Sequence, residues 1–295
     1  MTGRGAPASL PPMRPLALAL ALVASVAAPA AGPAAAQDRA ASHCIALAEA
    51  PGVEYVHAAS FGQPLDEFSV RLSYLDHAMF LLETPGGVSA VTNYVGYLGS
   101  TDHVPDVVTM NHAHSTHWTA NPDPRIAHVL EGWAGPEQVV ETGDLLVRNV
   151  PTDIRGRMGG VEVGGNSIYV FETAGLCIGH LGHLHHEPDE GQYAALGRLD
   201  VVMAPVDGGL TLPRETLREV LARLRSSVVI PMHWFGPGNL EAFLVEMGGA
   251  GFAVERTGES FVEVSLRSLP DEPTIVVLDP AFLSDGGGDG GSGGE

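Results

Sequence analysis

The chain has 295 residues and carries 15 Lys and Arg against 35 Asp and Glu, which gives a formal net charge of −20 at pH 7. Nucleic acids and anionic membrane surfaces are polyanions, so this charge argues against both as partners. A small-molecule ligand that is neutral, cationic or bridged by a metal ion fits the charge better.

The first 36 residues have the pattern of an export signal. Arg4 and Arg14 precede an apolar run over residues 16–28, and a small-residue stretch that ends at Ala36 matches a cleavage site. A membrane span is the alternative, but the run is shorter than the roughly 20 apolar residues that a bilayer requires. We therefore expect an exported protein, periplasmic or secreted, with no membrane insertion after cleavage.

The rest of the chain divides into three predicted parts. Residues 37–67 form a lead-in segment, and residues 68–283 form one domain that is long enough for a sizeable core. Residues 284–295 form an acidic, glycine-rich tail. The tail has too little apolar surface to order itself, so we expect it to be disordered and solvated.

The two cysteines, Cys44 and Cys177, leave the question of a disulfide open. An exported chain meets an oxidising environment, in which the two thiols could pair. Cys177 lies in the apolar run Leu176-Cys177-Ile178, however, and a buried free thiol is the commoner state of such a residue. We favour free thiols and keep the disulfide as the alternative.

The first half of the domain is predicted to consist of strands. Residues 68–75 alternate between apolar and polar side chains, and residues 78–82 are continuously apolar. A Thr-Pro-Gly-Gly turn then precedes residues 88–91, so antiparallel strands are expected here. Further strands are predicted over residues 106–110, 126–130, 144–150, 167–172 and 175–179.

In the second half, strands alternate with helices. Residues 200–206 and 227–232 are short apolar runs of the kind that form buried strands. Apolar residues recur with a period of about 3.6 over residues 214–225, which predicts an amphipathic helix, and a second helix is predicted over residues 239–247. Strands first and strand–helix alternation later favour a sandwich of packed sheets with helices outside.

Histidines are concentrated in three short segments, and each segment directly follows a predicted strand. His112, His114 and His117 have the spacing H-x-H-x-x-H. Imidazole is the commonest side-chain ligand of zinc and related metals, so this segment predicts a metal site. The histidines of the three segments are His112, His114, His117, His180, His183, His185, His186 and His233.

The order of the motifs resembles the metallo-β-lactamase-fold superfamily, and within it the branch of L-ascorbate 6-phosphate lactonase-like hydrolases. The motifs are His112-Ala-His114-x-x-His117, His180-Leu-Gly-His183, the strand that begins at Asp200, Ile230-Pro-Met-His233, and the opening strand from His77 to Glu83. The resemblance implies an α/β fold, a four-layer αββα sandwich, with a metal site at the edge where the two sheets meet. It further implies that His112 and His114 are the first pair of ligands and that His117 and His233 are ligands too.

Three positions depart from the superfamily's pattern. Thr116 replaces the Asp of H-x-H-x-D-H, His183 replaces the Asp that bridges two metals, and Asp153 falls where a third histidine of the first site is expected. An imidazole cannot bridge two ions as a carboxylate can, so we expect the site to hold one ion rather than two. Zinc is expected first, and iron or manganese are alternatives. The expected ligands are His112, His114, His117, Asp153, His183 and His233.

These residues predict an exported metal-dependent hydrolase that uses a metal-activated water on an ester, lactone, amide or phosphoester. His117 or His183, whichever is not a ligand, would shuttle the proton. Two alternatives stay open. One is a non-hydrolytic metal- or ligand-binding protein, because Thr116 has replaced an Asp, and the other is an iron-dependent oxygenase. The substrate and the oligomeric state are not determined by the sequence.

Overall fold

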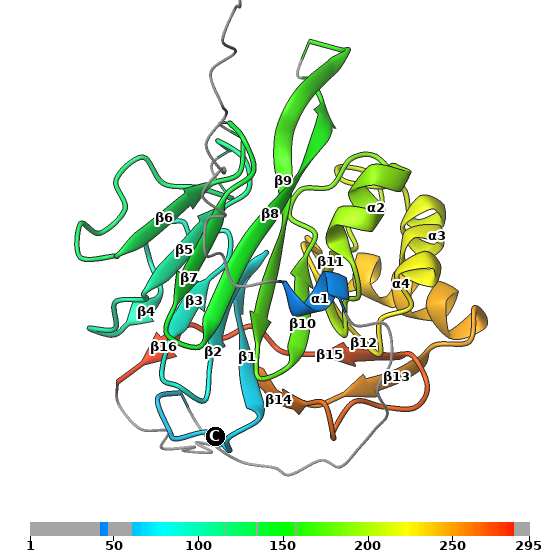
Figure 1. The fold of residues 1–295 in the computed structure, drawn as a ribbon. Helices are drawn as coiled ribbons and strands as arrows, with labels where there is room; N and C mark the ends of the chain where they lie inside the picture. Colours follow the sequence, from blue (N-terminus) through cyan, green and yellow to red (C-terminus); the bar gives the residue numbers. More distant parts are fainter. Residues whose placement is uncertain (1–41, 47–60, 115, 134, 157, 286–295) are drawn as a thin grey trace, which may run out of the picture. The chain divides into compact units, whose positions relative to one another are not determined.

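The structure is a computed structural model that describes residues 42–46, 61–114, 116–133, 135–156 and 158–285 (Figure 1). The expected export signal, most of the lead-in segment and nearly all of the expected tail lie outside the described residues. Within the described part of the chain, no helix combines the length and the apolar composition needed to cross a bilayer.

The domain extends slightly beyond the boundary expected at residue 283. Strand β16 (Leu283–Ser284) pairs with β4 (Gly99–Ser100) in a small two-stranded sheet. The carboxylate of Asp285 then accepts hydrogen bonds from Thr101 Oγ1 at 2.6 Å and from Asp102 N at 2.8 Å. Ser284 and Asp285 therefore belong to the folded domain.

The first of the two main sheets has six strands in the order β14-β1-β2-β3-β5-β6. Strands β1, β2 and β3 pair antiparallel, as predicted, and β3, β5 and β6 pair parallel. Alternate side chains face opposite sides of this sheet, as the pleat of a strand requires. The bounds are β1 (Ser69–Asp76), β2 (Met79–Glu83), β3 (Ser89–Val91), β5 (Val107–Met110), β6 (His128–Glu131) and β14 (Phe261–Ser265).

The second main sheet has eight strands in the order β13-β15-β12-β11-β10-β9-β8-β7. Its β7 to β10 region is antiparallel, and its β10 to β13 region is parallel. Strands β8 and β9 are longer than predicted, and their far ends project beyond the neighbouring strands in Figure 1. The bounds are β7 (Val139–Thr142), β8 (Leu145–Arg155), β9 (Val161–Thr173), β10 (Leu176–His180), β11 (Val201–Pro205), β12 (Val228–Met232), β13 (Ala253–Arg256) and β15 (Thr274–Val277).

The two main sheets pack face to face around a shared core. Tyr74 and Phe80 of the first sheet lie in the same buried cluster as Tyr169, Phe171 and Ile230 of the second. Each of these side chains is at most 1% exposed. Burying a large apolar side chain contributes about 1.5–3 kcal/mol, so this interface is the main source of stability that holds the sheets together.

Helices cover the outer face of the second sheet, where Figure 1 places them on one side of β10 to β12. They are α2 (Glu190–Leu196), α3 (Arg214–Leu224) and α4 (Pro237–Gly249). Leu217 and Leu221 of α3 and Phe243 of α4 pack in one cluster with Val202 and Val229 of the sheet. On the outer face of the first sheet, the described residues that provide cover come from loops, Trp118 and Trp133 among them. The predicted sandwich is confirmed.

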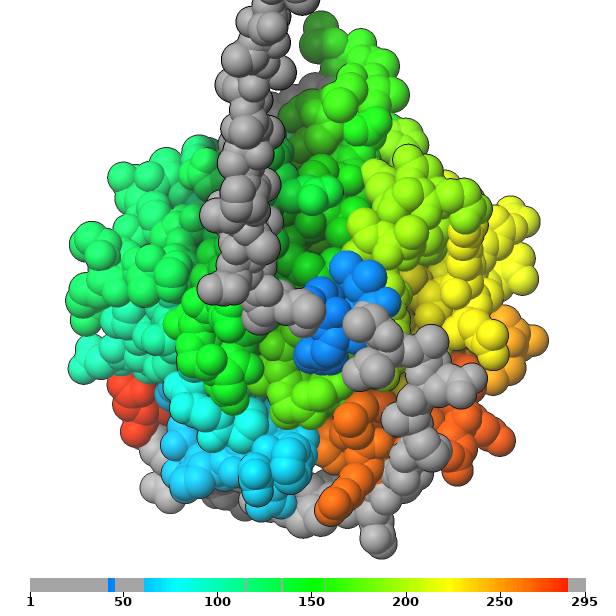
Figure 2. All heavy atoms as spheres, in the orientation of Figure 1, coloured from blue at the N-terminus to red at the C-terminus, as the bar shows by residue number. Residues whose placement is uncertain are grey.

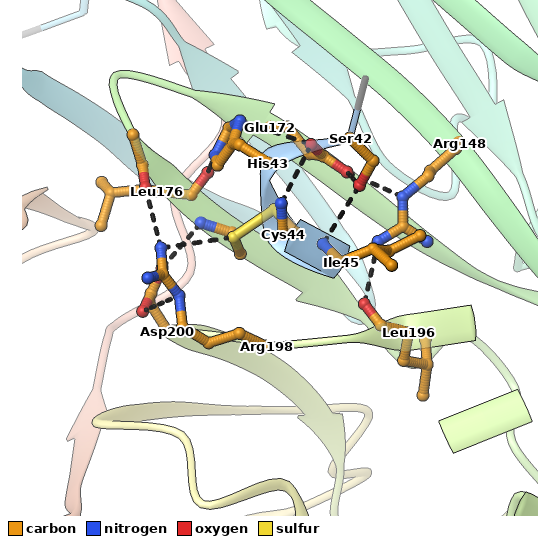
Figure 3. The surroundings of a disulfide bond; sticks show 12 residues. Ser42, His43, Cys44, Ile45, Arg148, Glu172, Leu176, Leu196, Arg198 and Asp200 are labelled. Carbon is orange, nitrogen blue, oxygen red and sulfur yellow. Dashed lines mark hydrogen bonds and ion pairs between the residues drawn. A yellow bond between two sulfur atoms is a disulfide. The ribbon is translucent and has the colours of Figure 1, made fainter. Parts of the chain in front are cut away.

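A disulfide joins the short helix α1 (His43–Ala46) to strand β10 (Figure 3). Cys44 and Cys177 are 1% and 0% exposed and belong to the apolar cluster on the outer face of the second sheet. Figure 2 shows α1, in blue, seated against the green part of the domain. The favoured prediction of free thiols is wrong, because α1 places a second cysteine over the face to which Cys177 points.

A buried ion pair lies beside the disulfide (Figure 3). Arg148 Nε donates to Glu172 Oε1 at 2.7 Å, and these side chains are 8% and 1% exposed. Burial alone would raise the pKa of Glu172, but hydrogen bonds from Ser42 and Arg148 outweigh it and leave that pKa below its usual value. The remaining guanidinium nitrogens of Arg148 donate to the carbonyls of Ala195 and Leu196. The pair therefore ties α1, two strands and α2 together.

Candidate metal centre

Four histidines reach one edge of the two main sheets from four different connections. His77 lies in the turn between β1 and β2, His117 follows β5, His183 follows β10 and His233 follows β12. The backbone joins the sheets at this edge, because His233 N donates to the carbonyl of His77 at 2.6 Å. We call this edge the seam. Such edges, at the carboxyl ends of parallel strands, are where α/β proteins usually bind ligands.

His77 and His233 both have a left-handed backbone, with φ angles of 45° and 60°. This conformation costs about 1–2 kcal/mol for a residue other than glycine. At His77 it is held in place by two hydrogen bonds to the carbonyl, from His233 N and from the hydroxyl of Tyr74 at 2.8 Å. Backbone strain of this kind is common at functional sites, so its presence at both residues makes the seam a candidate site.

His117 lies at the centre of the group and is 0% exposed. Its ring centroid is 5.5 Å from that of His77, 4.7 Å from that of His183 and 5.2 Å from that of His233. The Nε2 atoms of His117 and His233 are 3.3 Å apart. Two further rings join at the margin, and the six residues, called the histidine cluster below, are His77, His114, His117, His183, His185 and His233.

Asp207 fixes the tautomer of His233. The carboxylate Oδ2 lies 2.9 Å from His233 Nδ1, and the other oxygen accepts the backbone N–H groups of Gly209, Leu210 and Thr211. Burial would raise the pKa of Asp207, but the hydrogen bonds from His233 and Thr211 bring it below its usual value, so the carboxylate is ionised and accepts only. His233 must then carry its proton on Nδ1, which leaves the Nε2 lone pair facing His117.

A second chain of hydrogen bonds fixes the opposite tautomer at His183. The backbone N–H of Arg155 donates to His185 Nδ1 at 2.9 Å, and a backbone amide can only donate. A neutral His185 therefore carries its proton on Nε2, which lies 2.9 Å from His183 Nδ1 and donates to it. His183 in turn must carry its own proton on Nε2. It presents an N–H, while His233 presents a lone pair.

Burial keeps four rings of the cluster uncharged at neutral pH. Burial, followed by the charge of His233, lowers the pKa of His77 to about 4. It is also the largest cause of the low pKa of His117 and of His183, and it lowers the pKa of His185 to about 4. A ring nitrogen binds a metal only when it is unprotonated, so these rings are in the state that a ligand requires.

His180 is a structural residue at the same edge. Gly182 N donates to its Nδ1 at 3.1 Å, so the ring proton is on Nε2, which lies 2.9 Å from the Ala78 carbonyl and donates to it. Both ring nitrogens are occupied, and the side chain is fully buried. Gly182 has a φ of 62°, and a Cβ there would overlap the side chains of Asn111 and Asn166, so only glycine fits.

Of the predicted ligands, His117, His183 and His233 come together, and His114 joins them at the margin with Thr116 Oγ1 at 3.3 Å from its Nδ1. The other two predicted ligands, His112 and Asp153, engage the β8–β9 hairpin. His112 Nδ1 donates to the carbonyl of Gly165 at 2.6 Å, and the carboxylate of Asp153 accepts from Gly164 N at 2.9 Å. A register shift between Thr152 and Ile154 lies at this point of β8, and such irregularities re-aim side chains.

Sequence reasoning missed His77 and undervalued two other residues of the seam. The motifs place His77 only at the start of a strand, although its position between two apolar runs is typical of a turn. Asp207 is not among the expected site residues; one of its carboxylate oxygens holds the turn that follows β11, and the other lies against His233. His185 belongs to one of the three histidine segments but is not among the expected ligands, and it sets the tautomer of His183.

The donors of the cluster fit one metal ion. Among the described residues, His77, His117 and His233 place one ligand atom each within 4.8 Å of one another. His77 Nε2 and His117 Nδ1 are buried and have no hydrogen-bond partner. A buried polar atom without a partner costs about 1–3 kcal/mol, so the orphaned Nε2 of His77 is explained best by an ion that it faces. His117 faces His233 through its other ring nitrogen, Nε2.

The chain belongs to the metallo-β-lactamase superfamily, as the motifs predicted. A family model described as the beta-lactamase superfamily domain matches residues 71–233, which is more than half of the chain. The match begins in β1 and ends at His233, so it contains both sides of the seam and every predicted metal ligand.

Three known proteins are similar to this chain. A candidate Zn-dependent hydrolase of the superfamily from Thermotoga maritima is 26% identical, with a TM-score of 0.50, over 71% of this chain and 98% of its own. The metallo hydrolase Igni18 of Ignicoccus hospitalis is 18% identical, with a TM-score of 0.48, over 73% of this chain and 97% of its own. A UPF0173 protein of Pyrococcus abyssi is 23% identical over 196 residues, or 60% of this chain and 90% of its own.

Proposed function

We propose that this protein is a metal-dependent hydrolase whose reaction takes place at the histidine cluster. The observation that carries the proposal is the group of three converging imidazoles where the two sheets meet, one of which, His77, has a buried ring nitrogen without a partner. When bound there, a metal ion would polarise the scissile group and lower the pKa of water. Zinc is the first choice for an all-histidine donor set, with iron or manganese as alternatives.

His183 is proposed to stabilise the charge that develops on the substrate. Its Nε2–H is fixed by the chain from Arg155 through His185, and a preorganised donor of this kind is typical of oxyanion holes. The low pKa of its imidazolium makes it a poor carrier of an extra proton at neutral pH. A neutral hydrogen-bond donor is therefore a better role for His183 than the proton shuttle expected from the sequence.

Substrate recognition is proposed to use apolar contact as well. Phe235 is 60% exposed, and its ring centroid lies 5.1 Å from that of His77 and 5.2 Å from that of His233. An exposed aromatic ring beside a polar centre suits an ester, lactone, amide or phosphoester with an apolar substituent. The net charge of −20 favours a neutral or cationic substrate over an anionic one.

The test is turnover by the full chain after loading with zinc, manganese or iron in parallel. Nitrophenyl acetate, a γ-lactone and a nitrophenyl phosphodiester would serve as substrates. We expect turnover of at least one, and a loss of at least 100-fold in kcat/KM for His117→Ala. The control is His128→Ala, because His128 begins β6 at the end that pairs with Val107, away from the seam. Metal-loaded protein without turnover of any substrate, or equal activity of His117→Ala, would overturn the proposal.

A further inference from the structure

The superfamily pattern assigns the first pair of metal ligands to His112 and His114, but the geometry of the seam points elsewhere. His112 donates its Nδ1–H to Gly165 on the β8–β9 hairpin, which leaves its Nε2 unprotonated. It is nevertheless not among the three described residues whose ligand atoms converge at the cluster. The converging histidines are His77, His117 and His233. His77 lies upstream of the H-x-H-x-x-H segment, in the turn between β1 and β2.

We propose that His77 is a metal ligand, and that it forms a three-histidine centre with His117 and His233. The proposal rests on the metal dependence proposed above, but it concerns which residues hold the ion. Such a centre uses ligands from both main sheets, His77 and His117 from the first and His233 from the second, so the ion would bridge the seam.

The distances fit this assignment. Two nitrogens bound to a tetrahedral zinc ion at about 2.0–2.1 Å are about 3.3 Å apart. The Nε2 atoms of His117 and His233 are 3.3 Å apart, and the ring centroid of His77 is 4.0 Å from that of His233. His117 and His233 therefore need to move little to accept an ion, and His77 lies close enough to bind the same ion.

The position of the ring proton on each histidine distinguishes the proposed ligands from the neighbouring histidines. His233 offers a lone pair because Asp207 accepts its Nδ1–H, an arrangement common behind metal-binding histidines. His77 Nε2 is buried and has no hydrogen-bond partner, as expected for a ligand atom that binds a metal ion. His183 is the nearest competitor for a ligand place, but the bond from His185 occupies its Nδ1 and holds its proton on Nε2. His117 also carries its proton on Nε2, toward His233, but its Nδ1 has no partner and can take that proton when an ion binds.

The backbone supports the same choice. The left-handed turn at His77 is linked to the left-handed residue His233 by the hydrogen bond between their backbones. A merely structural turn of this length would more commonly use glycine or asparagine, which adopt positive φ at less cost. Histidine at both positions is explained if each ring must face the same point.

The test compares matched variants in metal-binding experiments. His77→Asn keeps a residue that tolerates positive φ, and His112→Asn is the control at a position that the superfamily pattern favours. Zinc affinity would be measured by competition with a chromophoric chelator, and cobalt-loaded samples would report ligand geometry through their visible absorption. We expect at least a 100-fold loss of affinity for His77→Asn and less than a threefold change for His112→Asn. For Asp207→Asn we expect a loss of roughly 10–100-fold.

Two results would overturn the proposal. One is unchanged zinc affinity and cobalt spectrum in His77→Asn, and the other is a loss confined to His112→Asn. In either case hydrolysis by the metal-loaded wild type would leave the proposed function standing. If His77→Asn does not fold, ¹⁵N-histidine NMR of the wild type decides. Zinc must then shift the ring nitrogens of His77, His117 and His233 but leave those of His112 in place.

Discussion

Removal of the Cys44–Cys177 disulfide is expected to lower the free energy of unfolding by about 5 kcal/mol. The bond joins residues 133 positions apart, and the entropy of closing a ring of that length in the unfolded chain corresponds to about 5 kcal/mol at room temperature. Domains of this kind have net stabilities of about 5–15 kcal/mol. The double variant Cys44→Ala/Cys177→Ala should therefore be marginal, even though its buried core is nearly unchanged.

The assay is urea unfolding of the full chain, followed by tryptophan fluorescence. Three samples are compared: oxidised wild type, wild type in reductant, and the double alanine variant. We expect the last two to coincide, with midpoints well below that of the first. Alkylation of denatured, unreduced wild type should label neither cysteine. A stability loss below about 1 kcal/mol, or two labelled thiols, would refute the reasoning.

Two further predictions concern buried charge. Glu172→Ala should lower the free energy of unfolding by about 3–5 kcal/mol, because it leaves Arg148 buried without its partner. The control, Glu241→Ala, removes an exposed ion pair with Arg256 and should change that free energy little. Equal effects of the two variants in urea titrations would contradict this. The stability of the metal-free protein should fall as the pH drops from 6.5 towards 4. Burial lowers the pKa of His180 to about 4, so only the unfolded chain takes up the proton in that range, at a cost of up to about 3 kcal/mol. Urea titrations at pH 7.5 and 4.5 test it, and an equal pH dependence in His180→Gln would exclude His180 as the cause.

The sandwich and the proximity of three of the predicted histidines could be predicted from the sequence, because both depend on local patterns. Alternating and continuous apolar runs predict strands, and the structure has a strand at each predicted position. His117, His183 and His233 follow such strands, and the carboxyl ends of strands in packed sheets lie together. Their convergence therefore needed no knowledge of the side chains between them.

The ligand geometry could not be predicted, because it depends on details of one or two residues. A register shift in β8 decides where Asp153 points, and no composition pattern marks it. The left-handed turn at His77 carries an imidazole where a glycine would have been recognised as a turn. The disulfide was missed for another reason. It depends on where the chain before β1 lies, and the short α1 has no periodic pattern that places it.

Because the seam joins distant segments of the chain, the histidine cluster can form only late in synthesis. His117 and His233 are separated by 116 positions, so the H-x-H-x-x-H segment leaves the ribosome long before its partner strand β12 does. Until then, His112, His114 and His117 lie on an unfolded chain, with a spacing that suits metal ligands. Metal bound to that segment would stabilise the unfolded state and oppose folding. Productive loading therefore requires that the chain fold first and receive its ion afterwards, and refolding with excess zinc should be slower than refolding with zinc added last.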